Sequence, residues 1–267
     1  MLKYFLVALF SLSSYLAALE GSPPKAKINS LTRAFYDRAR NRPLVTTLWF
    51  PEPFVKGKLY PLVVFSHDSC GSRLELAWMA EYFAENGYIA ASVDHYGDCQ
   101  YLKLPENKES LWDRPQDLTQ VMLALTTDTQ FGPHFKQDKA IIVGYSTGAL
   151  AALWLAGARA FKYPQKEGTL SYKDYRVRAI ILLAPGFGSY FDKDGLSLVK
   201  IPTLIVGAED DTLYPLPKNA MFFAKFISGA QYVKIGGAPH DFLLCPSRVQ
   251  KNKIIDVLSP FLLKNLN

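Results

Sequence analysis

A serine between two glycines is the part of the sequence best suited to nucleophilic chemistry. Ser146 lies in GYSTG, residues 144–148, which matches the pattern G-x-S-x-G. The preceding KAIIVGY is apolar and β-branched, as in a buried strand, and the following ALAALWLAGA favours a helix. Strand, tight turn and helix in this order predict a nucleophile elbow, in which the glycines permit the turn and the Ser146 hydroxyl is exposed at the start of the helix.

A serine nucleophile needs a base, and the chain has four histidines. In a nucleophile-elbow arrangement the acid and the base follow the serine along the chain. His67, His95 and His134 precede Ser146, whereas His240 follows it within GGAPHDF. We therefore expect His240 to be the base that takes the proton of Ser146.

The acid that orients the histidine should follow the strand between the serine and the histidine. Three carboxylates come shortly after IPTLIVG, namely Glu209, Asp210 and Asp211. The role of the acid is to hold the imidazole in one tautomer and to stabilise the imidazolium. From spacing alone, each of the three carboxylates remains a candidate for this acid.

An oxyanion hole requires two backbone N–H donors directed at the substrate carbonyl. The first predicted donor is the amide of Thr147, directly after the nucleophile. The second should come from the loop SHDSCGSR, which follows a predicted strand at residues 62–66. We expect Ser69 to supply it, with Asp68 as the alternative. His67 is expected to brace this loop.

Alternating strands and helices must position these residues. Short apolar runs predict strands at residues 44–50, 62–66, 89–93, 140–145, 179–184, 203–207 and 232–235. Helical patterns lie at residues 75–86, 117–126, 149–158, 217–226 and 254–263. This alternation predicts an α/β fold with a mostly parallel central sheet and helices on both faces. Ligands bind at the carboxyl ends of such strands, where the candidate residues fall.

The N-terminus has the pattern of a signal peptide. Residues 1–3 are short and basic, residues 4–18 are almost entirely apolar, and EGSPP then ends the run. We expect residues 1–18 to be the signal peptide of an exported protein, periplasmic or secreted, and residues 19–267 to form one domain. An uncleaved membrane anchor is the alternative, although the apolar run is short for a full span.

The composition indicates a globular protein and gives no sign of a nucleic-acid partner. A hydrophobic content of 49% with 20% charged residues is that of a globular protein. The net charge of +6 is modest, and no nucleic-acid-binding motif is present. Basic residues at positions 162–178 are most simply a solvated helix and loop, with weak contact to an anionic membrane surface as the alternative. We expect a monomer.

The three cysteines, Cys70, Cys99 and Cys245, allow at most one internal disulfide. Each follows a predicted strand end on the side of the expected site, so a bond between two of them could brace a loop there. Their pairing cannot be read from the sequence, and free thiols are an equal alternative. No spacing of cysteine or histidine indicates a metal site, and we expect neither a metal nor another cofactor.

The chain resembles the dienelactone-hydrolase-like and platelet-activating-factor-acetylhydrolase-like branch of the α/β-hydrolases. The resemblance runs from RNRPLVTTLWFP to HDFLLCP and includes PLVVFSHDSCGSR, ENGYIAASVDH, DRPQDLTQVMLAL and GYSTG. The segment GAEDDTLYP is also similar to cutinase-like polyester hydrolases, whose GAExDTxxP pattern carries the acid before the threonine. That similarity selects Asp211 over Asp210.

The resemblance implies an α/β-hydrolase fold and a carboxylic ester hydrolase that acts on small-molecule or lipid esters, with short-chain or phospholipid-type acyl groups. A cutinase-like polyester hydrolase is one alternative. The sequence departs from the common SHGxGG pattern by carrying Asp68 and Cys70 in place of glycines. A carboxylate at this point would oppose anion stabilisation if it pointed inward. A non-catalytic binding protein on the same scaffold is therefore a second alternative.

Overall fold

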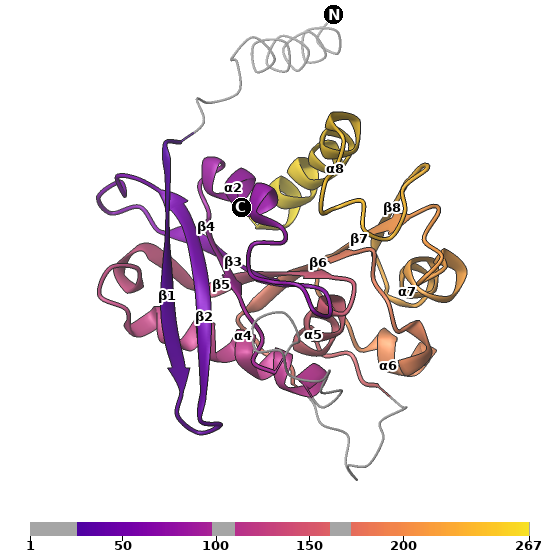
Figure 1. The fold of residues 1–267 in the computed structure, drawn as a ribbon, viewed down its shortest axis with the longest axis horizontal. Helices are drawn as coiled ribbons and strands as arrows, with labels where there is room; N and C mark the ends of the chain where they lie inside the picture. Colours follow the sequence, from indigo (N-terminus) through magenta and orange to yellow (C-terminus); the bar gives the residue numbers. More distant parts are fainter. Residues whose placement is uncertain (1–25, 98–109, 161–171, 267) are drawn as a thin grey trace, which may run out of the picture.

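A single eight-stranded sheet organises the molecule (Figure 1). The computed structural model describes residues 26–97, 110–160 and 172–266. The strands are β1 (Ile28–Asp37), β2 (Arg42–Pro51), β3 (Tyr60–Ser66), β4 (Ile89–Val93), β5 (Phe135–Tyr145), β6 (Val177–Leu183), β7 (Thr203–Ala208) and β8 (Gln231–Ile235). Their order across the sheet is β1-β2-β4-β3-β5-β6-β7-β8.

The sheet is parallel except at one edge. The pairs β1–β2 and β2–β4 are antiparallel, and the pairs from β4–β3 to β7–β8 are parallel. The prediction of a mostly parallel sheet is confirmed. The carboxyl ends of β3, β5, β7 and β8 lie at the same edge of the sheet, so the loops that follow them meet there.

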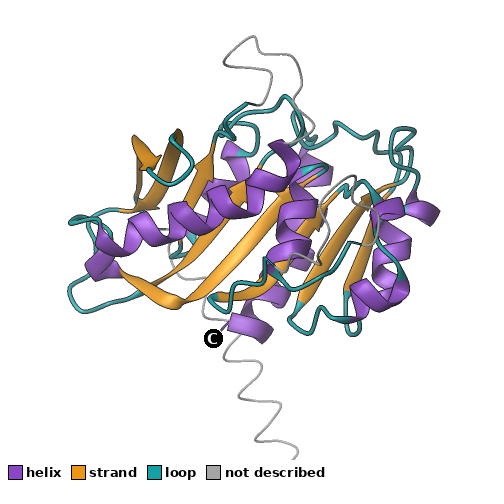
Figure 2. Ribbon diagram, turned by 90° about the horizontal axis from the view of Figure 1, so that it is seen from below, coloured by secondary structure: helices purple, strands orange, loops and turns teal. Residues whose placement is uncertain are grey.

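Helices cover both faces of this sheet (Figure 2). The helices are α2 (Ala77–Glu85), α4 (Ser110–Thr127), α5 (Gly148–Leu155), α6 (Lys193–Ser197), α7 (Ala220–Phe226) and α8 (Arg248–Leu266). Side chains of α4, α5, α6 and α7 pack into one buried cluster, and those of α2 and α8 pack into the other.

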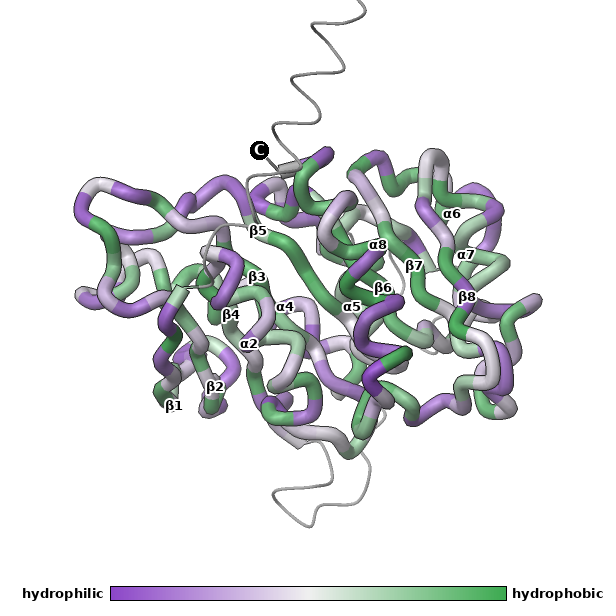
Figure 3. The backbone as a smooth tube through the Cα atoms, turned by 90° about the horizontal axis from the view of Figure 1, so that it is seen from above, coloured by the Kyte–Doolittle hydropathy of each residue, from purple (hydrophilic) through white to green (hydrophobic). Residues whose placement is uncertain are grey.

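Adjacent residues of the central strands supply the two cores. Val64 belongs to the cluster beneath α4 and α5, and its neighbour Val63 belongs to the cluster beneath α2 and α8. Because successive side chains of a strand point to opposite faces, a strand buried on both sides must be apolar throughout. This explains the continuous hydrophobic stretch of β5 in Figure 3.

The edge strand β1 was not predicted from the sequence. Its more buried face carries Leu31 and Phe35, but Arg33 lies between them and Asp37 ends the strand. These two charges have partners from outside the strand, since Arg33 contacts Asp128 and Gln130 while Asp37 contacts Arg40. The apolar alternation that would mark a strand is therefore interrupted by charged side chains whose partners lie elsewhere in the chain.

The N-terminal prediction falls outside the described residues. The predicted signal peptide, residues 1–18, belongs to the part that the structure does not describe. In the described ranges, no helix has both the length and the apolar character needed to cross a membrane.

Candidate active site

The turn between β5 and α5 places Ser146 beside the loop that follows β3. Ser146 has a left-handed φ of 51°, and its N–H donates to the carbonyl of Leu183 at 2.9 Å. A Cβ on Gly148 would collide with the backbone oxygen of Ser66. Glycine at position 148 therefore allows α5 to pack directly on the end of β3.

Ser146, His240 and Asp211 lie in hydrogen-bond contact. Nε2 of His240 is 2.8 Å from Oγ of Ser146, and Nδ1 of His240 is 2.7 Å from Oδ2 of Asp211. With Nδ1–H donating to the carboxylate, Nε2 of a neutral imidazole is left to accept the serine proton. The structure thus brings together three residues that lie far apart in the sequence.

The three acidic residues after β7 have different surroundings. Asp211 is buried, and its Oδ1 accepts from the N–H of Tyr214 at 2.7 Å, which orients the carboxylate. Glu209 is exposed and pairs with Lys234, and Asp210 is also exposed. Among the three, Asp211 is the one in contact with His240.

Two tyrosines that sequence reasoning missed hold His240 in place. The Tyr145 hydroxyl donates to the backbone carbonyl of His240 at 3.0 Å, and the two rings stack with centroids 5.7 Å apart. The Tyr214 ring lies edge-on to the imidazole at 5.2 Å. Tyr145 directly precedes Ser146 and Tyr214 follows Asp211 by three residues, and neither position carries a signal in the sequence alone.

The carboxylate of Asp68 occupies the predicted oxyanion hole. Its Oδ1 accepts from the N–H of Ser69 at 2.6 Å and from the N–H of Thr147 at 3.3 Å. Its Oδ2 lies 3.5 Å from Nε2 of His240. Ser69 and Thr147 thus direct their amides at one point, but an internal anion already lies there.

Two sequence predictions about this region need correction. The amide of Asp68, the alternative oxyanion donor, instead donates to Oε2 of Glu75 at 2.8 Å. Ser146 was expected to be exposed, but 0% of its surface is exposed. Asp68 and His240 both contact its hydroxyl and contribute to covering it.

Mutual contacts shift the pKa values of Asp68 and His240. Burial raises the pKa of Asp68, but hydrogen bonds with His240, Ser146 and the two amides outweigh it and lower that pKa to about 2. Burial lowers the pKa of His240, but hydrogen bonds and charges from Asp68 and Asp211 outweigh it and leave that pKa above its ordinary value. Each of the two pKa shifts favours the charged form of its own group, the carboxylate of Asp68 and the imidazolium of His240.

Several groups fix the backbone of the loop at Asp68. Its carbonyl accepts from Nδ1–H of His67 at 2.6 Å, from Arg114 at 3.1 Å and from the N–H of Gly71 at 3.1 Å. Nε2 of His67 accepts from the backbone N–H of His95 at 3.2 Å, which matches the expected bracing role of His67.

A disulfide also restrains this loop. Cys70 is disulfide-bonded, so the expectation of at most one bond holds and the alternative of three free thiols is wrong. Cys245 is a free, exposed thiol. The remaining cysteine of the chain, Cys99, lies outside the described residues.

A second set of serine, histidine and aspartate contacts is buried next to the loop that follows β3. Oγ of Ser66 is 2.9 Å from Nε2 of His95, whose Nδ1 is 2.9 Å from Oδ2 of Asp117. The side chains of His95 and Asp117 are 0% and 1% exposed, so no substrate can reach them. Arg40 and Arg42 pair with the other oxygen of Asp117. Since Ser66 is the last residue of β3, this network helps to fix the strand end from which the loop at residues 67–71 begins.

A series of partly exposed aromatic rings in mutual contact begins next to the imidazole of His240. Tyr214 contacts Phe187 at 5.2 Å between ring centroids, Phe187 contacts Tyr190 at 5.2 Å, and Tyr190 stacks on Trp112 at 6.4 Å. This aromatic surface, residues 112, 187, 190 and 214, gives apolar groups of a substrate a place to pack beside His240.

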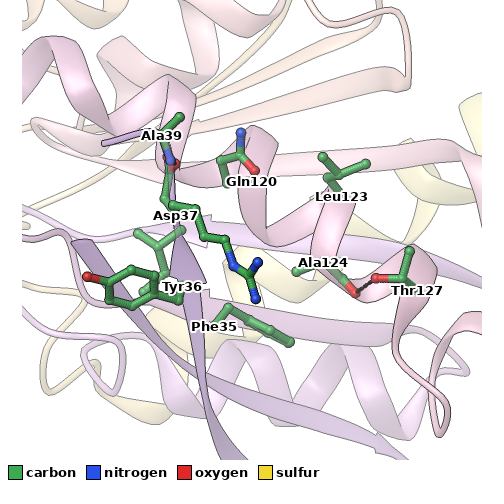
Figure 4. A pocket seen from close by; sticks show the side chains of 10 residues that line it. Phe35, Tyr36, Asp37, Ala39, Gln120, Leu123, Ala124 and Thr127 are labelled. Carbon is green, nitrogen blue, oxygen red and sulfur yellow. Dashed lines mark hydrogen bonds between the residues drawn. The ribbon is translucent and has the colours of Figure 1, made fainter. Parts of the chain in front are cut away.

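A pocket of about 530 Å³ lies elsewhere, between β1 and α4 (Figure 4). Its lining includes Phe35, Asp37, Gln120 and Leu123, and none of the three residues in contact at Ser146. The described residues contain no group of three or more side chains placed to hold a metal ion.

Comparison with known proteins finds cutinases. The chain is 23% identical to Cutinase 2 of Thermobifida cellulosilytica over 208 residues, which cover 76% of this chain and 68% of that protein. It is 23% identical over 208 residues to Cutinase cut1 of Thermobifida fusca, covering 76% and 56%. It is 22% identical over 199 residues to Cutinase est1 of Thermobifida alba, covering 73% and 57%. No family model matches the chain.

These similarities and the observed sheet agree with the fold class expected from the sequence. The chain aligns with cutinases over most of its length, and its mostly parallel eight-stranded sheet carries helices on both faces. This arrangement is an α/β-hydrolase fold. The aligned region spans only a little over half of the cut1 and est1 proteins. At this level of identity, the assignment of the site rests on the geometry of this chain's own residues.

Proposed function

We propose that the protein is a serine hydrolase that cleaves carboxylic esters, with Ser146 as nucleophile, His240 as base and Asp211 as the acid that orients it. The observation that carries this proposal is the bridge formed by His240, 2.8 Å from Ser146 on one side and 2.7 Å from Asp211 on the other. The similarity to cutinases supports an ester as the substrate.

The reaction follows from the positions of these groups. The Ser146 hydroxyl attacks the ester carbonyl while its proton passes to Nε2 of His240, and the alcohol leaves with that proton. The resulting acyl group on Ser146 is released by a water molecule that His240 activates. Asp211 stabilises the imidazolium in both steps, and the amides of Thr147 and Ser69 are the donors for the carbonyl oxygen.

The substrate class divides into two candidates. Short-chain or phospholipid-type acyl esters are the first, as the dienelactone-hydrolase-like resemblance implies. A polyester is the second, favoured by the similarity to cutinases and by the aromatic surface beside His240. Comparing soluble short-chain esters with a polyester film as substrates separates the two.

Hydrolysis of p-nitrophenyl esters, from acetate to palmitate, tests the proposal. Wild type should hydrolyse the short esters, and Ser146→Ala and His240→Ala should each lower kcat by about 10⁴-fold or more. Circular dichroism should show that both variants are folded. A folded wild type without activity on any ester, and without labelling by a fluorophosphonate, would overturn the proposal and favour a non-catalytic binding protein.

Export through a signal peptide at residues 1–18 is part of the same proposal. The disulfide at Cys70 supports it, because disulfides persist in oxidising compartments and are rare in the cytosol. Cleavage after Ala18 leaves Leu19 as the first residue of the mature protein. Mass spectrometry of the protein from its native host tests this expectation, and a retained segment 1–18 would favour the membrane anchor instead.

A further inference from the structure

The side chain of Asp68 has the contacts expected of a reaction product. After ester hydrolysis, a carboxylate product has one oxygen in the oxyanion hole and the other near the histidine and the serine. Asp68 reproduces this arrangement, with Oδ1 on the amides of Ser69 and Thr147 and Oδ2 at 3.5 Å from His240.

We propose that Asp68 is an internal product analogue, which fills the oxyanion hole of the resting protein and must leave before an ester carbonyl can bind. This inference rests on the proposed esterase function. The Asp68 side chain then sets how much of the protein is competent for reaction at any moment, and it limits the substrates to those whose carbonyl displaces a tethered carboxylate.

The surroundings of Asp68 favour motion of the side chain over motion of the loop. Its backbone N–H and carbonyl are both engaged, by Glu75 on one side and by His67 and Arg114 on the other. The carboxylate is 20% exposed, so a rotation about the side-chain bonds can carry it to water. The charged form is held by charge-assisted hydrogen bonds, which are stronger than neutral ones.

Three substitutions separate a blocking role from a purely electrostatic one. Asp68→Ala empties the hole, whereas Asp68→Asn removes the charge but keeps an oxygen that can accept from the two amides. Asp241→Asn removes an exposed negative charge next to His240 without touching the hole. If Asp68 blocks the hole, kcat/KM on p-nitrophenyl acetate should rise by about 10-fold or more in Asp68→Ala, less in Asp68→Asn, and hardly at all in Asp241→Asn.

Inhibition by acetate gives a second readout that a structural role of Asp68 would not change. A tethered carboxylate competes at a high effective concentration, so acetate should inhibit wild type only weakly. In Asp68→Ala the empty hole should accept acetate, and the inhibition constant should fall by about 10-fold or more. Asp241→Asn should keep the wild-type constant.

The outcomes distinguish this inference from the proposed function. Faster hydrolysis, faster fluorophosphonate labelling of Ser146 and tighter acetate inhibition in Asp68→Ala support the blocking role. An active, labelled wild type whose Asp68→Ala and Asp68→Asn variants are folded but no faster, with an unchanged acetate constant, overturns it and leaves the esterase proposal intact. Absence of labelling in wild type and both folded variants overturns the esterase proposal, and this inference with it.

Discussion

Oδ2 of Asp211 lies 2.7 Å from Nδ1 of His240, whereas the neighbouring Asp210 is exposed to solvent. The two carboxylates are adjacent in the sequence and therefore form a matched pair for substitution. Asp211→Asn should lower kcat by about 10³- to 10⁴-fold, because the wrong imidazole tautomer is then stabilised. Asp210→Asn should keep wild-type activity. Steady-state kinetics on a p-nitrophenyl ester decide the assignment, and a larger loss in Asp210→Asn would reverse it.

The pH profile should reflect the two carboxylates around His240. Catalysis needs the neutral imidazole, and the raised pKa of His240 means that activity falls with decreasing pH through a midpoint above the ordinary histidine value of 6.5. Besides Ser146, the titratable groups in contact with this ring are Asp68, Asp211, Tyr145 and Tyr214.

Asp68→Ala should move that midpoint to lower pH, because one stabilising carboxylate is lost. The Asp241→Asn variant serves as the control for a general change in charge near the ring. The measurement is kcat/KM as a function of pH, and an unchanged midpoint in Asp68→Ala would contradict the assigned interaction.

Gly148 should tolerate no side chain. Gly148→Ala places a Cβ against the backbone oxygens of Ser66 and His67, neither of which can yield without moving β3. We expect a loss of about 1–3 kcal/mol in the free energy of unfolding, together with reduced activity. Gly236→Ala is the matched control, because its Cβ would be 3.4 Å from an exposed Glu209 side chain. Urea unfolding should show almost no change for the control.

The buried carboxylate of Asp117 should matter more to stability than its neighbour Asp113. Both pair with Arg40 and Arg42, but the Asp117 side chain is 1% exposed and that of Asp113 is 29% exposed. Asp117→Asn leaves charged arginines without their buried partner and should cost about 3 kcal/mol or more. Asp113→Asn should cost about 1 kcal/mol or less. Urea unfolding measures both losses, and an equal loss of unfolding free energy in the two variants would contradict the stabilising role of the buried network around Asp117.

The described cysteines should differ in their reaction with a thiol reagent. Cys245 is exposed and free while Cys70 is disulfide-bonded, so the native protein should react with one equivalent of a thiol reagent. Unfolding under reducing conditions should expose all three cysteines of the sequence. Cys245→Ser should abolish the native reaction, and a second native thiol would contradict the disulfide.

The sequence predicted the strands that are buried on both faces, because β-branched apolar runs such as those of β3 and β5 have few alternatives. It also singled out Ser146 and His240, since the positions of both follow from chain order and strand ends. The edge strand β1 was missed because Arg33 and Asp37 interrupt its apolar face and find their partners outside the strand.

The orientation of Asp68 could not be predicted from the sequence for a related reason. The departure from the common glycine pattern marks the position, but whether the carboxylate turns inward depends on the two amides, on His240 and on the backbone anchors at Glu75 and Arg114. These groups come from separate elements, and only the folded chain brings them to one point.

The contact of Gly148 with Ser66 has a consequence for anyone redesigning this protein. Because the start of α5 packs closely on the backbone at the end of β3, Ser146 and the loop at residues 67–71 are held side by side. Insertions in the loop at residues 67–71 would therefore displace both this loop and Ser146. Substrate range should therefore be varied through the side chain at position 68 and through the aromatic surface, while the backbone geometry is kept.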